Sequence, residues 1–299
     1  MKPSLFWLSV LVATFVSADI NAQVASPAPS EAAITVPEPS PSAQPEPEVR
    51  RATLATPPEE HTTPQKTTKL GYNDIHVDGP FIAITFDDGP HSENTPRLLD
   101  ILKERGIKAT FFVVGQCAQE YPDIMKRIAA EGHEIGNHSW SHPAFAKMSE
   151  SAVRSQISRT SDVIQQTAGT PITLLRPPYG SITASQREWI THDLGLKIIL
   201  WSVDPLDWKN RNASIVEQRI VSAAKPGDII LSHDIHKTTV DAMPETLDRL
   251  LAKGFKFVTV SELIAMEKPL PPKPTATPAA DETQQAKKAA STRKKNKRS

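Results

Sequence analysis

Residues 81–90 read Phe-Ile-Ala-Ile-Thr-Phe-Asp-Asp-Gly-Pro, and this stretch decides the fold. The first six residues are apolar or β-branched, which predicts a strand buried in a parallel sheet. Gly89 and Pro90 predict a sharp turn that ends the strand. Asp87 and Asp88 therefore lie together at the strand end. Two adjacent carboxylates repel each other unless a positive group is nearby, and a metal ion is the simplest such group.

Two histidines follow about 50 residues later, in the segment Asn-His-Ser-Trp-Ser-His at 137–142. His138 and His142 are four residues apart, so on one helical turn both imidazoles would face the same ion. Two imidazoles and one carboxylate, with open positions for water and substrate, form a common hydrolytic site for zinc or a similar divalent metal. The spacing alone is also found on ordinary surface helices. Together with the Asp-Asp pair it predicts a metal site.

The overall composition argues against one class of function. The chain has 299 residues, with 34 Lys plus Arg and 34 Asp plus Glu, so its formal net charge at pH 7 is zero. A general nucleic-acid-binding protein needs a basic surface to hold phosphates. Cys117 is the only cysteine, so the chain forms no internal disulfide.

Both ends of the chain differ from its middle. Residues 1–25 combine Lys2, an apolar run and small-residue cleavage sites, which predicts a secretory signal peptide. The run is shorter than the roughly 20 residues of a spanning helix, so we expect cleavage and a secreted or periplasmic protein, with an uncleaved membrane anchor as the alternative. Residues 26–69 are predicted to be a Pro-rich disordered linker and residues 269–299 a disordered Pro-rich and basic tail. The basic end of the tail is either simply solvated or adheres to an anionic cell-wall or membrane surface.

The remaining residues, 70–268, are enough for one sizeable core. Strand-like runs alternate there with amphipathic helical patterns, such as a helix over 95–105, a strand over 109–114 and a helix over 149–168. About seven β/α units predict an α/β fold with a parallel sheet. Each polar cluster follows a strand, as at the active-site edge of a (β/α) barrel. We therefore expect a distorted or incomplete barrel rather than an open sheet.

A third cluster, Leu-Arg-Pro-Pro-Tyr-Gly at 175–180, follows a short predicted strand. The prolines fix the backbone, and Gly180 permits an unusual dihedral angle. The segment is either a turn with a surface arginine or a functional element. In the second case Arg176 orients a carboxylate and keeps it ionised, while a fixed backbone N–H faces an oxyanion.

The last two clusters follow strands predicted over 197–203 and 228–231. Val-Asp-Pro-Leu-Asp-Trp at 203–208 places a carboxylate beside an indole. This arrangement suits either a pocket that orients a histidine or a capping aspartate with a core tryptophan. His233 lies just past the second strand. A lone histidine there is commonly structural, but beside a base and a metal it is the natural general acid.

Taken in order, TFDDGP, HSWSH, RPPYG, the Asp-Trp pair and Leu-Ser-His resemble the motifs of the polysaccharide deacetylase family, carbohydrate esterase family four. The resemblance covers roughly residues 75 to 265 and implies a distorted (β/α) barrel that uses zinc, cobalt or a related divalent ion. It implies that the metal ligands are Asp88, His138 and His142. It also implies that the catalytic residues are the base Asp87 with its partner Arg176, and the acid His233 oriented by Asp207. Substrate contacts would come from the backbone N–H of Tyr179 and from Trp208, Leu231 and Pro177.

The resemblance also implies the reaction. We expect a metal-dependent N-deacetylase that acts on N-acetylglucosamine-containing glycans, either peptidoglycan or chitin-type oligomers, and releases acetate. Three alternatives stay open: an O-acetyl esterase on xylan-like sugars, a hydrolase of a small cyclic amide, and a non-catalytic glycan-binding protein of the cell wall. The motifs keep every matched functional residue, which argues against the last of these.

Overall fold

The computed structural model describes residues 69–269. The predicted signal peptide, linker and tail lie outside these residues, apart from Lys69 and Pro269 at the two edges. Within residues 69–269, no helix is both long enough and apolar enough to cross a membrane.

Strand β1 (Phe81–Asp87) is the central strand, and it runs one residue beyond the predicted 81–86. Every residue from Ile82 to Asp87 is buried, as expected for a strand covered on both faces. It pairs in parallel with β2 (Thr110–Val113), β6 (Ile229–Ile230) and β7 (Lys256–Phe257).

The sheet has seven strands in the order β5-β4-β3-β2-β1-β6, with β7 paired to β1. Strand β3 spans Glu134–Asn137, β4 spans Leu174–Leu175 and β5 spans Lys197–Ile198. All pairings between these strands are parallel. Beyond β5 the pairing continues only through isolated bridges such as Val203 with Ile230. The sheet is therefore a curled, incompletely closed (β/α) barrel, which confirms the predicted fold.

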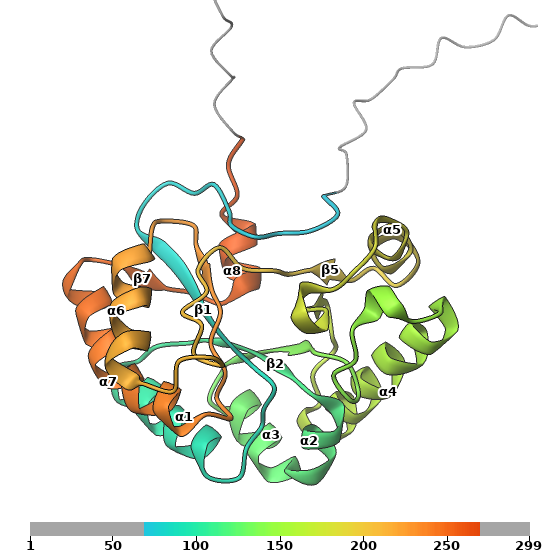
Figure 1. The fold of residues 1–299 in the computed structure, drawn as a ribbon, viewed down its shortest axis with the longest axis horizontal. Helices are drawn as coiled ribbons and strands as arrows, with labels where there is room; N and C mark the ends of the chain where they lie inside the picture. Colours follow the sequence, from blue (N-terminus) through green and yellow to red (C-terminus); the bar gives the residue numbers. More distant parts are fainter. Residues whose placement is uncertain (1–68, 270–299) are drawn as a thin grey trace, which may run out of the picture. The chain divides into compact units, whose positions relative to one another are not determined.

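Helices surround the sheet (Figure 1). Several begin at a residue whose side chain accepts a backbone N–H of the first turn, including Ser149 before α4 and Thr183 before α5. The α-helices of the described range are α1 (Asn94–Glu104), α2 (Gly115–Glu120), α3 (Pro122–Ala130), α4 (Glu150–Ala168), α5 (Ala184–Asp193), α6 (Ala213–Ala223), α7 (Lys237–Ala252) and α8 (Val260–Ala265). Short 3₁₀ turns occur at η1 (Phe145–Lys147) and η2 (Pro178–Gly180).

The structure corrects three local predictions. His138 and His142 lie on a loop and not on a helical turn. The sequence pattern predicts a helix near residues 243–253, but α7 begins at Lys237 and holds Pro244 in its interior. Helix α2 is an additional element that the pattern does not predict. Strands β5, β6 and β7 have two residues each and are shorter than the runs 197–203, 228–231 and 255–260 that predict them. Past β5 the pairing is reduced to isolated bridges at Ile199 and Val203.

The two faces of β1 have different neighbours. Ile82, Ile84 and Phe86 pack in the large apolar cluster beneath the outer helices. Side chains alternate along a strand, so Thr85 and Asp87 lie on the other face, inside the barrel. The barrel interior is therefore partly polar.

Candidate functional site

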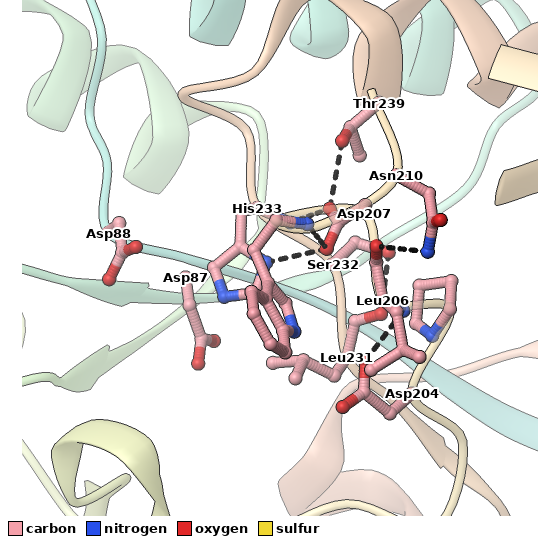
Figure 2. Close-up of polar contacts among 12 residues, drawn as sticks. Asp87, Asp88, Asp204, Leu206, Asp207, Asn210, Leu231, Ser232, His233 and Thr239 are labelled. Carbon is pink, nitrogen blue, oxygen red and sulfur yellow. Dashed lines mark hydrogen bonds and ion pairs between the residues drawn. The ribbon is translucent and has the colours of Figure 1, made fainter. Parts of the chain in front are cut away.

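Five predicted motifs meet at one edge of the sheet, where the parallel strands have their carboxyl ends. This is the edge at which (β/α) barrels place their active sites. The side chains gathered there are Asp87 at the end of β1 and Asp88 just after it, His138 and His142 after β3, Arg176 after β4, Asp207 in the loop before α6, and His233 after β6. Figure 2 shows Asp87, Asp88, Asp207 and His233 at this edge.

Asp88, His138 and His142 form a compact cluster whose ligand atoms all lie within 4.8 Å of one another. Asp88 Oδ1 is 3.4 Å from His138 Nε2 and 3.2 Å from His142 Nε2. His138 Nδ1 lies 2.7 Å from the carbonyl oxygen of Arg176. A carbonyl only accepts, so Nδ1 carries the proton and the Nε2 lone pair faces the cluster.

The cluster fits a divalent cation. Asp88 Oδ1 is buried and accepts no hydrogen bond from the described residues. Burial raises the pKa of Asp88, but His138, His142 and His233 outweigh that effect and hold the pKa below its ordinary range. Burial also lowers the pKa of His142, which favours the neutral imidazole that binds metals. Two imidazoles and a carboxylate are a common ligand set for zinc.

The loop that carries both histidines has an unusual backbone. Ser139 has φ 69° and His142 has φ 60°, both in the left-handed region. The side chain of Asn137 accepts the Ser139 N–H at 2.8 Å, and Ser139 Oγ accepts the His142 N–H at 3.0 Å. The imidazoles converge because of this folded loop and not because of a helical period.

Arg176 is fully buried inside the barrel and fixes Asp87. Its Nη1 donates to Asp87 Oδ1 at 2.6 Å and to Thr85 Oγ1 at 2.7 Å, and its Nη2 donates to the Leu200 carbonyl at 2.9 Å. Burial lowers the pKa of Arg176, and the adjacent Asp87 opposes that shift. The second oxygen, Asp87 Oδ2, lies 3.7 Å from His138 Nε2, beside the metal cluster.

Asp207 orients His233 on the opposite side of the site (Figure 2). His233 Nδ1 donates to Asp207 Oδ1 at 2.8 Å, and the His233 backbone N–H donates to Asp207 Oδ2 at 2.8 Å. Thr239 Oγ1 donates to the same Oδ2 at 2.8 Å. Burial lowers the pKa of His233, but Asp207, Asp87 and Asp88 outweigh burial and raise it to about 9.

The predicted substrate-binding residues differ in how far their side chains are exposed to solvent. Tyr179 is 69% exposed, with φ 59° and its ring edge-on to His142 at a centroid distance of 4.5 Å. Trp208 is 49% exposed, whereas Leu231 and Pro177 are buried. Two exposed aromatic rings thus accompany the polar cluster.

Sequence reasoning missed several residues that support the site. Thr85 lies two residues before Asp87, so the alternation of side chains along a strand places both on the same face. The sequence pattern of β1 could therefore have identified Thr85 as a neighbour of Asp87. Thr239 and Asp234 gave no motif signal. Asp234 is fully buried, bonds Thr95 Oγ1, and lies so near Gly89 that a Cβ there would be 2.5 Å from its carboxylate oxygens.

Comparison with known proteins places this site in a family. The polysaccharide deacetylase family model matches residues 74–199. The peptidoglycan-N-acetylglucosamine deacetylase PgdA of Listeria monocytogenes is 46% identical over 182 residues, which are 61% of this chain and 38% of that protein. The match therefore spans less than two thirds of that relative's length.

Solved structures agree with this assignment. The crystal structure of the Bc1960 peptidoglycan N-acetylglucosamine deacetylase, in complex with an N-hydroxybenzamide, superposes with a TM-score of 0.63 at 38% identity, over 67% of this chain and 95% of that one. A CE4 family pseudoenzyme from Bacillus anthracis gives a TM-score of 0.62 at 29% identity, over 66% of this chain and 69% of that one. The chain belongs to the polysaccharide deacetylase family.

Proposed function

We propose that this protein is a metal-dependent hydrolase that removes N-acetyl groups from N-acetylglucosamine-containing glycans and releases acetate. Peptidoglycan is the first candidate substrate, because the Listeria relative is named for it, and chitin-type oligomers come next. One observation carries the proposal. The cluster of Asp88, His138 and His142 adjoins an arginine-held carboxylate, Asp87, and an aspartate-held imidazole, His233.

The cation would be held by Asp88, His138 and His142, with zinc favoured and cobalt as the alternative. A bound divalent ion supplies Lewis-acid polarisation of the amide carbonyl and lowers the pKa of bound water.

Asp87 is the proposed general base. Arg176 occupies one carboxylate oxygen and leaves Oδ2 to take the proton from the attacking water. The guanidinium also compensates the negative charge of this buried carboxylate.

His233 is the proposed general acid. With a pKa raised to about 9 it is protonated at neutral pH, and Asp207 occupies Nδ1, so Nε2–H donates to the leaving nitrogen. An acid and a base with opposite protonation needs predict a bell-shaped pH–rate profile.

The backbone N–H of Tyr179 is the proposed oxyanion donor. It makes no hydrogen bond with any residue in 69–269, and the left-handed conformation of this residue belongs to the rigid turn after Pro177. A fixed, unpaired donor of this kind stabilises negative charge that develops during the reaction. We assign Trp208, Leu231 and Pro177 to the walls around the acetyl group.

Two rival functions use the same architecture. An O-acetyl esterase would need the same base, acid and metal, and a non-catalytic binding protein would need none of them. The pseudoenzyme among the structural matches means that the fold alone does not establish catalysis. The intact set of Asp87, Asp88, His138, His142 and His233 supports an active enzyme.

A substrate panel tests the proposal. Zinc-loaded protein is incubated with N-acetylated chitooligosaccharides, peptidoglycan fragments and O-acetylated xylooligosaccharides, and a loss of 42 mass units per acetyl group is followed by mass spectrometry. We expect loss from the N-acetylated glycans and none after metal removal. Loss only from the xylan substrates would favour the esterase, and loss from none would favour a binding protein.

We also propose that the protein is exported through residues 1–25 and that its basic tail contacts an anionic cell-wall or membrane surface. The charge and hydropathy pattern of the sequence supports this. N-terminal sequencing of protein recovered outside the cytoplasm would show a start near residue 19 or 26 if the segment is a cleaved signal, and at residue 1 or 2 if it is an anchor.

A further inference from the structure

The loop between β3 and η1 holds both predicted histidine ligands in a conformation that the chain does not favour by itself. Left-handed backbone at a non-glycine residue, as at Ser139 and His142, persists only when the surrounding structure fixes it. The contacts that fix this loop therefore decide where the histidines lie.

Helices α2 and α4 provide those contacts from outside the loop. The backbone N–H groups of Gly115 and Gln116, at the start of α2, donate to the carbonyls of Ser139 and Trp140 at 2.9 and 3.1 Å, and α4 contributes a side chain. Gln156 Oε1 accepts the backbone N–H of Trp140 at 2.8 Å and that of Ser141 at 2.9 Å. Gln156 Nε2 donates to Ser141 Oγ at 3.1 Å. One amide side chain thus satisfies the two consecutive N–H groups that immediately precede His142.

The Trp140 side chain anchors the apex of the loop by packing against two helices. The Trp140 ring lies so close to Gly115 of α2 that a Cβ there would be 2.5 Å from it. On α4, the Arg159 guanidinium stacks over the same ring at 4.0 Å. The backbone of the loop apex is consequently held between α2 and α4.

The two histidines depend on this support to different extents. The backbone N–H of His138 donates to Val113 at 3.0 Å, and its Nδ1 is held by Arg176, so the sheet fixes it. The ring of His142 makes no hydrogen bond within residues 69–269. It lies against the Tyr179 and His138 rings, and its Nε2 is 3.2 Å from Asp88 Oδ1. Its position follows from the backbone before it.

We infer that Gln156 is a positioning residue that holds the loop so that His142 meets the metal ion, an inference that rests on the proposed function. Outer contacts of this kind commonly change metal affinity by roughly 10- to 100-fold when they are removed. Gln156 acts on the cation through its hydrogen bonds to the Trp140 and Ser141 N–H groups and to Ser141 Oγ.

The test compares three substitutions on α4. Gln156→Met keeps the length of the side chain and removes its acceptor and donor. Gln156→Glu keeps an oxygen that accepts both N–H groups. Gln165→Met makes the same chemical change at an exposed position whose side chain forms no hydrogen bond with the described residues. The dissociation constant for zinc is measured for each metal-free protein by competition with a chromogenic chelator, and circular dichroism checks that each variant is folded.

We expect Gln156→Met to bind zinc roughly 10- to 100-fold more weakly than the wild type, and both Gln156→Glu and Gln165→Met to bind within about threefold of it. If Gln156→Met binds zinc as tightly as the wild type, this inference is overturned while the proposed function stands. Equal weakening in Gln156→Met and Gln156→Glu would also overturn it, because the acceptor oxygen would then be irrelevant. A wild-type protein that binds no zinc would overturn the proposed function, and this inference with it.

Discussion

Asp207 holds both the ring and the backbone of His233, with one carboxylate oxygen on Nδ1 and the other on the main-chain N–H, each at 2.8 Å. Two bonds from one carboxylate leave the imidazole a single orientation with Nε2 free. Asp207 is fully buried, and so its charge acts on His233 with little screening by solvent. One residue, Asp207, therefore both orients the proposed acid His233 and favours its protonated form.

Replacement of Asp207 by asparagine should lower the pKa of His233. Burial lowers the pKa of His233, and Asp207 is the group that raises it most. Without the Asp207 charge only Asp87 and Asp88 oppose burial, so we expect the pKa in metal-free protein to fall from about 9 by more than about one pH unit. NMR titration of the histidine ring protons measures it. The alkaline limb of the pH–rate profile should move to lower pH accordingly.

Thr239→Val is the matched control for this change. It removes one donor to Asp207 and leaves the negative charge in place, so the pKa of His233 should change much less. If His233 titrates at the same pH in wild type and Asp207→Asn, Asp207 does not set its protonation.

Asp234 should make the folded protein less stable as the pH rises. Burial, the largest effect, raises its pKa to about 7, whereas an aspartate in an unfolded chain titrates near about 4. Between these values the folded state keeps a proton that the unfolded state has lost, so stability decreases with pH and the full penalty is present above pH 7. We therefore compare the melting temperatures of metal-free wild type and metal-free Asp234→Asn. The difference between them should shift in favour of the variant by several degrees between pH 5 and pH 8.

Asn at position 234 keeps an oxygen that accepts from Thr95, so the comparison isolates the charge. Asp162→Asn, at an exposed carboxylate of α4, should leave the pH dependence unchanged. Parallel melting curves for the wild type and Asp234→Asn across this range would contradict the assignment.

Arg176 should be essential for stability as well as for the proposed chemistry. Arg176→Met leaves Asp87 buried without its cation, a change that costs about 3–5 kcal/mol in comparable buried pairs. Urea denaturation measures the loss. The double variant Arg176→Met/Asp87→Asn should recover part of it, because the uncompensated charge is gone. No recovery would mean that lost packing, and not the charge of Asp87, accounts for the cost.

The sequence predicted the central strand and the convergence of the motifs because both depend on local patterns. A run of apolar and β-branched residues identified β1, and the position of each polar cluster just past a predicted strand placed Asp87, Arg176 and His233 at one edge. Parallel strands bring their carboxyl ends together whatever the details of the loops.

The remaining contacts depend on tertiary packing that no local pattern encodes. The helical interpretation of His138 and His142 used a spacing of four, but the loop achieves the same convergence through left-handed residues. Gln156 and Thr239 reach the site from helices α4 and α7, and nothing in their flanking sequence distinguishes them from other polar positions of those helices.

The most direct test of the central claim is the rate of acetate release by wild type and Asp87→Asn at equal zinc content. The account predicts that both proteins bind one zinc ion, because Asp87 is not among the proposed ligands, and that the variant is slower by roughly 10²- to 10⁴-fold because the general base is lost. Equal rates in the two proteins at the same zinc content would contradict it.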